Sequence, residues 1–394
     1  MAWKRFAVLG VGSRGEWWSR AIAKQFTGTI DIVALCDHNA GRNQRLAGLI
    51  AEHGQRPALF SDFARMLAEA KPDAVLIAVP DHEHARYATA AMRAGIDVVL
   101  EKPIACTAED CRAILAARRE TGRRCVVGFN LRWAPYFTQL KDIVLSGVIG
   151  DPVAVDMQWL LDTSHGADYF RRWHRQLGKS GGLLVHKSTH HFDLVNWLLD
   201  SDPVSVFARG ARRFYTPQNA DALGLQDRGP RCLDCRAAAR CPYRLDLTKD
   251  AHLKGLYLEH EAHDGYLRDR CVFSPEIDIP DSMSVSARYA SGALLTYSLQ
   301  AFSPWEGLTL GVDGTKGRLE FKHVEGGETR TRVMPLGQPG YDVEVWKGDG
   351  PHGGGDVRML EALFGEPPHD RLGRAADERA GAWSAMIGIT ANAS

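Results

Sequence analysis

The sequence KRFAVLGVGSRGEWWSRAIAKQFTGTIDIVALCD, residues 4–37, decides the fold of the first part of this chain. Its apolar run at 4–9 predicts a buried strand that leads directly into a glycine-rich turn, and a helix is expected at 16–26. A second apolar strand at 31–36 ends in Asp37, which lies 22 residues after the last glycine of the turn. A G-x-G-x-x-G turn between strand and helix, followed at this distance by an acid, is typical of a dinucleotide-binding Rossmann unit.

Each glycine of the turn has its own steric role. Gly10 permits the tight turn, Gly12 lets a pyrophosphate approach the backbone, and Gly15 lets the helix pack near the strand. The free N–H groups at the start of the helix then face the phosphates. Asp37 can accept hydrogen bonds from ribose hydroxyls and would repel a 2′-phosphate, so the sequence predicts NAD rather than NADP. The alternatives are an ordinary βαβ unit, or a phosphate bound by one of two nearby arginines, Arg42 and Arg45.

The composition is that of an ordinary globular protein: 394 residues, 45% hydrophobic, with no net charge and a pI near 7.2. This length predicts two domains with sizeable cores. The absence of a basic stripe argues against a nucleic-acid partner, and no apolar run reaches the length of about 18 residues that a membrane span needs. The first residues lack the layout of a signal peptide, so we expect a cytoplasmic enzyme with no membrane partner.

The pattern of strands and helices changes about a third of the way along this α/β chain. Strands and helices alternate at first, which predicts an NAD-binding Rossmann domain with a doubly wound parallel sheet at 1–129. Runs of strands follow at 130–394 and predict a substrate-binding α+β domain with an open, mostly antiparallel sheet. Within it we expect one continuous helix at 182–199, a loop-rich insertion at 216–280 and closing helices within 355–393.

Reactive side chains are concentrated in three segments. Two of them, PDHEH at 80–84 and EKP at 101–103, follow the carboxyl ends of predicted strands, where ligands bind in such sheets. The third, GGLLVHKSTHHFD, occupies 181–193 in the second domain. Together they offer histidines that titrate near working pH and a lysine that can stabilise a developing alkoxide, as the oxidation of an alcohol requires.

The third segment places several of these groups at helical spacing. In a helix His186, His190 and Asp193 are spaced i, i+4 and i+7, so they would share one face. Lys187 and His191 would point about 100° away from it. A cleft lined by this face is the functional interpretation. The alternatives are structural or solvated histidines, and a metal held by the histidines at i and i+4.

Several motifs together resemble those of the Gfo/Idh/MocA oxidoreductases, the glucose–fructose oxidoreductase and inositol dehydrogenase superfamily. They are GVGSRG, VPDHEH, AGIDVVLEKP, GFNLRWAP and the GG…H…D segment, at 10–15, 79–84, 94–103, 128–135 and 181–193. The resemblance covers nearly the whole chain and implies a Rossmann domain followed by a larger domain with an open sheet. It matches Lys102 to the lysine near the nicotinamide and the substrate hydroxyl, and His190 to the catalytic histidine. Many members carry an aspartate where this chain has His186, which leaves the path of the proton open.

The candidate site residues follow from the motifs and the resemblance. The catalytic candidates are Lys102, His190 and His186. The cofactor-binding candidates are Gly10, Gly12, Ser13, Arg14, Gly15, Asp37, Pro80, His84, Glu101 and Lys102. The segment DYFRRWHRQLGK at 168–179 could form an aromatic and charged substrate wall or a solvated loop. The substrate-binding candidates are Asn130, Arg132, Tyr169, Arg171, Trp173, His174, Lys187, Asp193 and His352.

Four cysteines in the insertion form a possible metal site. Cys232, Cys235 and Cys241 lie close together in the sequence, and Cys271 follows at a distance. Four thiolates suit a structural zinc ion, and an iron–sulfur cluster is the less favoured occupant. The alternatives are four unrelated thiols or a disulfide formed by oxidation.

The sequence therefore predicts an NAD-dependent oxidoreductase that oxidises a secondary hydroxyl of a sugar, cyclitol or glycoside. The alternative enzyme is an NAD-dependent glycoside hydrolase, which some relatives of this superfamily exemplify. It works by transient oxidation, elimination, hydration and re-reduction, with no net redox change. A non-catalytic NAD-binding sensor is the second alternative. We expect a small-molecule sugar or glycoside as partner and a homodimer or homotetramer.

Overall fold

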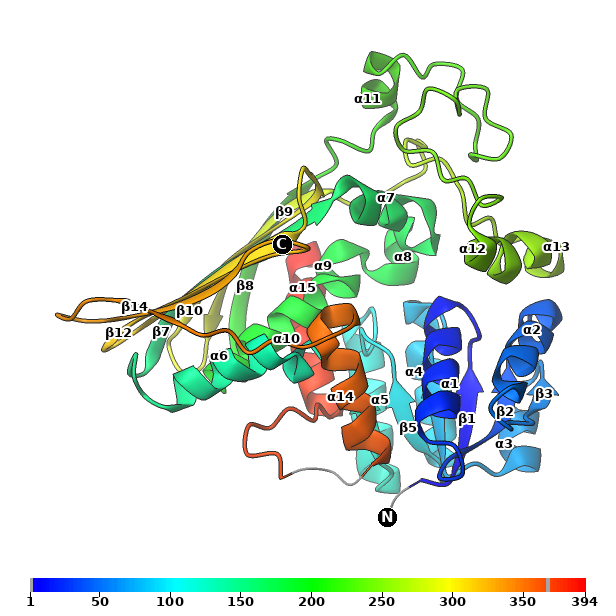
Figure 1. Cartoon of the computed structure of the whole chain (residues 1–394), viewed down its shortest axis with the longest axis horizontal. Coiled ribbons are helices and arrows are strands. Elements are labelled where there is room, and N and C mark those ends of the chain that lie inside the picture. The colour runs from blue at the N-terminus through cyan, green and yellow to red at the C-terminus, as the bar shows by residue number, and fades with distance from the viewer. Residues whose placement is uncertain (1–2, 366–368) are drawn as a thin grey trace.

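A six-stranded parallel sheet forms the first half of the computed structural model, which describes residues 3–365 and 369–394 (Figure 1). The strand order is β3-β2-β1-β4-β5-β6, so the chain reverses direction across the sheet between β1 and β4. Ligands bind at such a switch point, outside the carboxyl ends of the strands. The strands are β1 Arg5–Leu9, β2 Asp31–Cys36, β3 Ala58–Phe60, β4 Ala74–Ile77, β5 Asp97–Leu100 and β6 Cys125–Val127.

Helices connect these strands and cover both faces of the sheet. They are α1 Ser13–Gln25, α2 Ala40–Ala51, α3 Phe63–Ala70, the short η1 Asp81–Glu83, α4 His84–Arg93 and α5 Ala108–Thr121. Thr107 caps α5, because its hydroxyl accepts a hydrogen bond from the Asp110 N–H at 3.1 Å. The apolar strands are almost fully buried between the helix layers, which is why they lack a polar alternation.

The second sheet has eight strands in the order β14-β13-β12-β11-β7-β10-β9-β8. All neighbours are antiparallel except β7 and β10, which run parallel. The strands are β7 Pro152–Asp162, β8 Pro203–Ala211, β9 Ser282–Tyr289, β10 Leu294–Ser303, β11 Gly307–Gly314, β12 Gly317–Val324, β13 Thr329–Pro335 and β14 Tyr341–Val343. The predicted fold class is confirmed.

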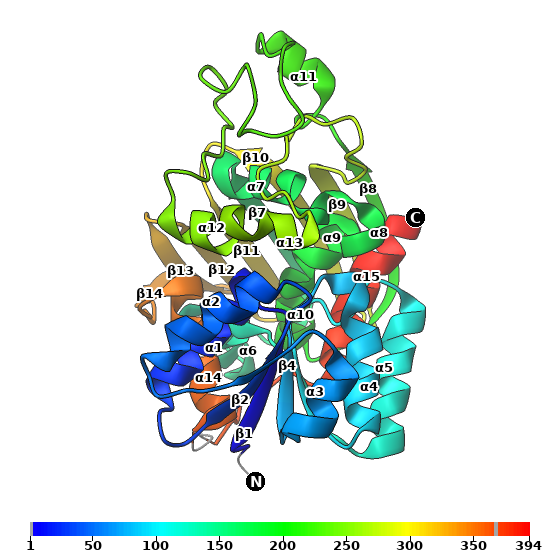
Figure 2. The ribbon, with the colours of Figure 1, turned by 90° about the vertical axis from the view of Figure 1, so that its right-hand side faces the viewer.

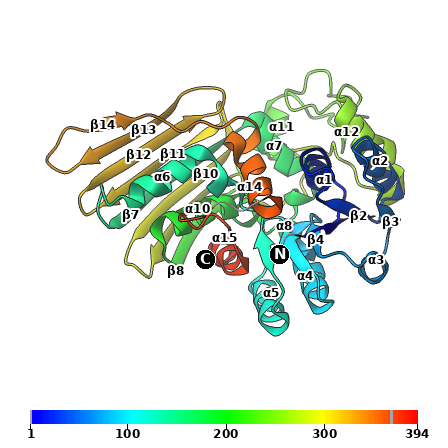
Figure 3. The ribbon, with the colours of Figure 1, turned by 60° about the horizontal axis from the view of Figure 1, so that its bottom comes forward.

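One face of the large sheet carries the helices of the second domain and the other is uncovered (Figures 1 and 3). Buried and exposed positions alternate along β9 and β10, as expected for a sheet with one packed face. The helices are α6 Pro135–Leu145, α7 Thr163–Arg171, α8 Leu177–Ser180, α9 Gly182–His186, α10 Ser188–Leu199, α14 Gly355–Phe364 and α15 Glu378–Ala393, with 3₁₀ turns η2 Asn130–Trp133, η3 Trp173–Arg175 and η5 Pro351–Gly354.

The continuous helix predicted at 182–199 is wrong, because the helix is broken at Lys187 between α9 and α10. There the φ of Lys187 is −95°, and the His190 N–H bonds to the Lys187 carbonyl rather than to that of His186. The break places His186 at the end of α9 and His190 and Asp193 in α10, so the three residues do not belong to one continuous helix.

The C-terminal helices return the chain to the Rossmann half. Met359, Leu360 and Phe364 of α14 are buried in one apolar core with Trp3 and Phe6. The other helix, α15, packs against α10 and reaches α5 and β6. The second half of the chain thus contributes to the layer that covers the first sheet.

The insertion between β8 and β9 is rich in loops, as predicted. Its helices are α11 Pro217–Ala222, α12 Ala251–Leu256, η4 Leu258–His260 and α13 Glu261–Asp264. It projects beyond the large sheet at α11, while α12 and α13 return to lie beside α2 of the Rossmann half (Figures 2 and 3). Over the residues that the structure describes, we found no helix with both the length and the apolar character needed to cross a bilayer.

Candidate active site

The glycine-rich turn has the geometry that a dinucleotide site requires. Gly10 adopts a φ of +86°, and a Cβ there would lie 2.6 Å from the Ala78 carbonyl oxygen. A Cβ on Gly15 would lie 1.9 Å from the Gly10 oxygen. A Cβ on Gly12 would meet only the Tyr257 hydroxyl within 4 Å, at 3.8 Å. The residues present therefore fit a pyrophosphate between the turn and the start of α1.

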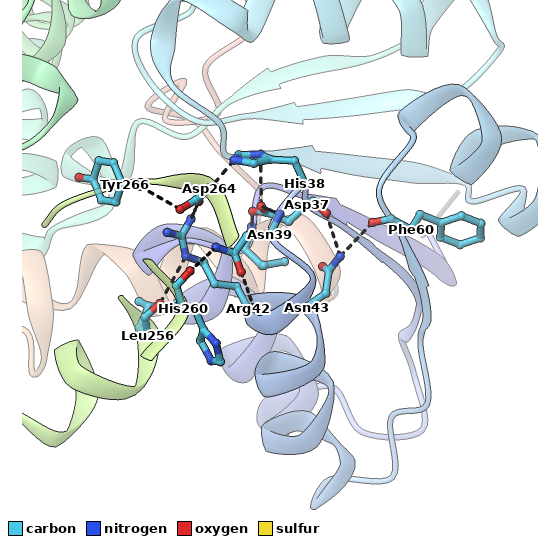
Figure 4. Close-up of polar contacts among 11 residues, drawn as sticks. Asp37, His38, Asn39, Arg42, Asn43, Phe60, Leu256, His260, Asp264 and Tyr266 are labelled. Atoms are coloured by element: carbon cyan, nitrogen blue, oxygen red, sulfur yellow. Dashed lines mark hydrogen bonds and ion pairs between the residues drawn. The ribbon is translucent and has the colours of Figure 1, made fainter. Parts of the chain in front are cut away.

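Asp37 is held rigidly at the end of β2, beside this turn. Its carboxylate accepts hydrogen bonds from the Val11 N–H at 2.9 Å and the Asn39 N–H at 2.8 Å. The two arginines considered as alternative phosphate ligands have other partners. Arg42 pairs with Asp264 at 2.9 Å (Figure 4), and Arg45 pairs with Glu16. This arrangement favours a ribose with free hydroxyls over one with a 2′-phosphate.

Half-buried Arg14 forms an ion pair with buried Glu101 at the start of α1. The Arg14 guanidinium lies 2.7 Å from Glu101, and the Trp18 indole N–H donates to the same carboxylate oxygen at 2.7 Å. Burial alone would raise the pKa of Glu101, but the charge of Arg14 and this N–H hold it below its usual value. Glu101 therefore stays ionised and fixes Arg14 in place.

Lys102, His186 and Asp81 form a connected group where the two halves of the chain meet. The Lys102 ammonium lies 3.1 Å from the His186 carbonyl oxygen and 3.4 Å from His186 Nε2. His186 Nδ1 lies 2.6 Å from Asp81 Oδ2. Because an ammonium only donates, His186 Nε2 is the acceptor. Nδ1 therefore carries the ring proton and donates a hydrogen bond to Asp81. The third N–H of Lys102 is left for a ligand.

Burial dominates the titration of this group. It lowers the pKa of Lys102 from 10.5 to about 8, against the opposing charges of Asp81 and Glu101. Burial, reinforced by unfavourable interactions with His174 and the charge of Lys102, holds the pKa of His186 well below its usual range. His186 is therefore neutral near pH 7, and the pKa of Lys102 lies at about 8.

His190 is the second buried histidine near Lys102. Its ring packs edge-on against Phe129 at 5.7 Å, and its Nδ1 has no hydrogen-bond partner among the described residues. Burial, reinforced by the charges of Lys102 and Lys187, keeps its pKa well below the usual range. A neutral, unpartnered imidazole beside a lysine is suited to accept a proton from a ligand.

The segment expected to form a substrate wall surrounds His186 with aromatic rings. Tyr169, Trp173 and His174 lie 5.6, 5.7 and 4.0 Å from the His186 ring, centroid to centroid. The segment is not a solvated loop, because it folds into α7, η3 and α8. Arg171 points away from this wall, to the Tyr243 carbonyl and Cys232 Sγ of the insertion.

Other candidate residues have partners within the protein. Arg132 and Asp193 form a buried two-pronged ion pair at 2.6 and 2.7 Å. Both ring nitrogens of His84 face carbonyl oxygens, at 2.7 Å for Pro103 and 3.1 Å for Val79, so this side chain braces the Lys102 loop instead of facing the cofactor. Asn130 and His352 each form a hydrogen bond with Asp356, both at 2.7 Å. The Lys187 ammonium lies over the Trp159 ring, 5.5 Å from its centroid.

The four insertion cysteines line one small cavity, and all eight cysteines of the chain are free thiols. The Gly229 N–H points at Cys235 Sγ from 3.2 Å, and the Leu245 N–H at Cys232 Sγ from 3.4 Å. Within 3–365 and 369–394, no three His, Cys, Asp or Glu side chains are already placed to bind one metal ion. The donor chemistry of four thiols fits zinc.

Comparisons with known proteins agree with this geometry. A family model described as "Oxidoreductase family, NAD-binding Rossmann fold" matches residues 4–129, and one described as "Oxidoreductase family, C-terminal alpha/beta domain" matches residues 141–390. The fold and the site thus define a two-domain oxidoreductase with an NAD-binding Rossmann fold. The chain belongs to the Gfo/Idh/MocA family, as the motifs predicted.

Relatives and solved structures with this architecture include sugar and polyol dehydrogenases. "Putative oxidoreductase YteT" of Bacillus subtilis (strain 168) is 35% identical over 403 residues, which cover 98% of this chain and 94% of that protein. "Inositol 2-dehydrogenase 1" of Saccharopolyspora erythraea is 33% identical over 209 residues, 53% of this chain and 58% of that protein. A structure of levoglucosan dehydrogenase with NADH and levoglucosan superposes with a TM-score of 0.71 at 18% identity, over 99% of this chain and 97% of that one.

The motif analysis did not identify two residues that the structure brings to the site. Asp81 follows the carboxyl end of β4 and supplies the acid that pairs with His186. Its segment was recognised as reactive, but Asp81 itself was not a candidate site residue. Tyr257 reaches the glycine-rich turn from the insertion, and its hydroxyl accepts a hydrogen bond from the Ser13 N–H at 3.2 Å. The only sequence signal for Asp81 was its place after a strand, and nothing in the sequence near Tyr257 indicated its contact.

Proposed function

We propose that the protein is an NAD-dependent oxidoreductase that oxidises a secondary hydroxyl of a sugar, cyclitol or glycoside. The observation that carries this proposal is the juxtaposition of Lys102 and an unpartnered His190 beside a turn shaped for a dinucleotide. The aromatic rings around His186 give a surface on which a sugar ring can stack. The relatives named for inositol and levoglucosan support a polyol-like substrate.

The residues divide the chemistry between them. Lys102 donates its free N–H to the substrate hydroxyl oxygen and stabilises the negative charge that develops there. His190, which is neutral, accepts the hydroxyl proton as the carbonyl forms. Bound NAD supplies the acceptor for the hydride. Asp81 and His186 act through Lys102, because they orient its ammonium and do not need to touch the substrate.

The glycosidase alternative uses the same first step. It then removes the acidified neighbouring proton, expels the aglycone, adds water and returns the hydride, which requires a second base. The pair of His186 and Asp81, which replaces the usual aspartate, supplies a second titratable group beside Lys102. This pair is the reason to keep the glycosidase as the second candidate.

A substrate panel tests both candidates. Sugars, cyclitols and glycosides are supplied with NAD, and NADH absorbance and free sugar are followed together. NADH formation with a sugar or polyol supports the oxidoreductase, and free sugar without accumulating NADH supports the glycosidase. The proposal fails if no compound reduces NAD and no glycoside is cleaved.

We further propose that the four insertion cysteines close on a structural zinc ion. The N–H groups directed at Cys232 and Cys235 are the contacts that stabilise metal-bound thiolates. Protein purified without chelators is expected to contain about one zinc per chain by elemental analysis, and Cys235→Ser should lose it and unfold at a lower temperature. Cys111→Ser, which changes a buried thiol elsewhere, is the control. Zinc-free wild-type protein of unchanged stability would contradict this proposal.

The setting of the enzyme follows from the same features. We propose a cytoplasmic homodimer or homotetramer in which the uncovered face of the large sheet pairs with another subunit. The regular alternation along β9 and β10 leaves mainly polar side chains on that face, where another subunit could pack.

A further inference from the structure

The α12–α13 segment, residues 251–264, lies against the part of the Rossmann domain that faces the adenosine end of a dinucleotide. The Asn39 side chain donates to the His260 carbonyl at 2.9 Å (Figure 4). Arg42 donates to the Leu256 carbonyl at 3.3 Å and pairs with Asp264. Asn39 is also the residue whose N–H is bound by Asp37, so the segment is anchored directly beside the ribose-binding acid.

The α12–α13 segment and α2 pack closely against each other at two glycines. A Cβ on Gly41 would lie 2.3 Å from His260 Nδ1, so the histidine ring fits only against a glycine in the first turn of α2. Gly255 of α12 faces Arg45 of α2, and a Cβ on this glycine would lie 3.2 Å from the Arg45 Nε. The segment is thus seated on α2 by side-chain shape as well as by hydrogen bonds.

The segment also reaches the phosphate-binding turn. The Tyr257 hydroxyl accepts a hydrogen bond from the Ser13 N–H, one of the amides at the start of α1 that have no partner within the helix. Tyr257 is buried, and its ring lies between the guanidinium groups of Arg42 and Arg268, 5.4 and 5.7 Å away. The hydroxyl is therefore fixed above the turn where a pyrophosphate would bind.

A second set of contacts ties the segment to the cysteine cluster. Arg231, next to Cys232, pairs with Glu261 of α13 at 2.9 Å and with Asp269 at 2.8 Å. Asp269 in turn accepts the Leu233 N–H at 2.8 Å. The segment is thus held from both sides, by the Rossmann domain and by the folded part of the insertion.

We propose that α12–α13 is a clamp that forms the outer wall of the dinucleotide site and keeps NAD bound between turnovers. The inference rests on the proposed function, because it requires that NAD binds. Tyr257 supplies a hydroxyl to the pyrophosphate from outside the Rossmann domain, and the pairing of Arg42 with Asp264 withholds that arginine from a 2′-phosphate. A retained NAD must be regenerated in place. Either a second carbonyl substrate accepts its hydride, or the hydride returns to the oxidised sugar.

Two glycines of one helix provide a matched test. Gly41→Ala pushes the His260 ring away, whereas Gly48→Ala on the same helix meets open space and controls for helix propensity. Tyr257→Phe removes only the hydroxyl. Each holoenzyme is loaded with radiolabelled NAD, passed through a desalting column and chased with unlabelled NAD, and the released label is counted over time.

The expected result is that wild type and Gly48→Ala keep the label through the column. Gly41→Ala and Tyr257→Phe should release it at least about tenfold faster, which corresponds to 1.4 kcal/mol. Equal release from all four proteins would overturn the clamp while leaving NAD binding intact. If none of the four binds NAD at all, the proposed function fails with it, so the two failures are distinguishable.

Discussion

Replacing Lys102 with methionine is expected to lower kcat/KM for hydroxyl oxidation by about 10³-fold, because the side chain supplies the N–H that meets the developing alkoxide. NAD should still bind, since the glycine turn and Asp37 are untouched. The measurement is initial-rate kinetics of NADH formation on the best substrate from the panel, together with NAD binding by fluorescence. Lys24→Met, which changes an exposed lysine in the last turn of α1, is the matched control.

The stability of Lys102→Met separates a catalytic role from a structural one. Burial lowers the pKa of Lys102 from 10.5 to about 8, so the charged lysine destabilises the folded state. This destabilisation is fully present below pH 8 and decreases as the pH rises toward 10.5. Removing it should leave the free energy of unfolding at pH 7 unchanged or raise it, by up to about 3 kcal/mol. A large loss of stability would instead attribute the lost activity to misfolding.

The same lysine predicts the shape of the pH profile. The ammonium form donates to the substrate oxygen, so kcat/KM should fall about tenfold per pH unit above a pH of about 8. Lys102→Arg keeps its charge at every accessible pH. This variant should be less active overall but should lack the fall above pH 8. If its profile matches that of the wild type, another group is responsible for the fall.

Local sequence signals predicted the Rossmann half well. The glycine spacing and the apolar runs each act within a few residues, and their elements form at the expected places. The α14 helix also matches, because its apolar positions recur at the helical period. The strands β13 and β14 were not anticipated, since they lie at the edge of the sheet and carry mixed polar residues.

The candidate site was less predictable because its contacts join residues far apart in the chain. Asp81 and His186 are 105 residues apart, and Ser13 and Tyr257 are 244 apart. No spacing rule connects such pairs. The break at Lys187 likewise has no glycine or proline to announce it, so periodicity alone extended the helix through it.

Asp193 illustrates how burial changes the interpretation of a motif residue. The sequence analysis made it a substrate-binding candidate, whereas the structure buries it against Arg132, which also donates to the Gly373 carbonyl at 3.1 Å. Burial raises the pKa of Asp193 even though the charge of Arg132 acts in the opposite direction. The unfavourable free energy of desolvating this carboxylate thus exceeds its favourable interaction with Arg132, as is common for buried ion pairs.

Asp193→Ala is therefore expected to lower the free energy of unfolding by about 3–5 kcal/mol, because it leaves the Arg132 guanidinium buried without its counter-charge. Urea denaturation followed by circular dichroism measures the change. The double variant Arg132→Met with Asp193→Leu removes both charges and should recover most of the loss. If Asp193 instead contacts the substrate, Asp193→Ala would raise KM while leaving the urea midpoint near that of wild type. In that case the double variant would rescue nothing, so the two roles give opposite patterns in the same pair of proteins.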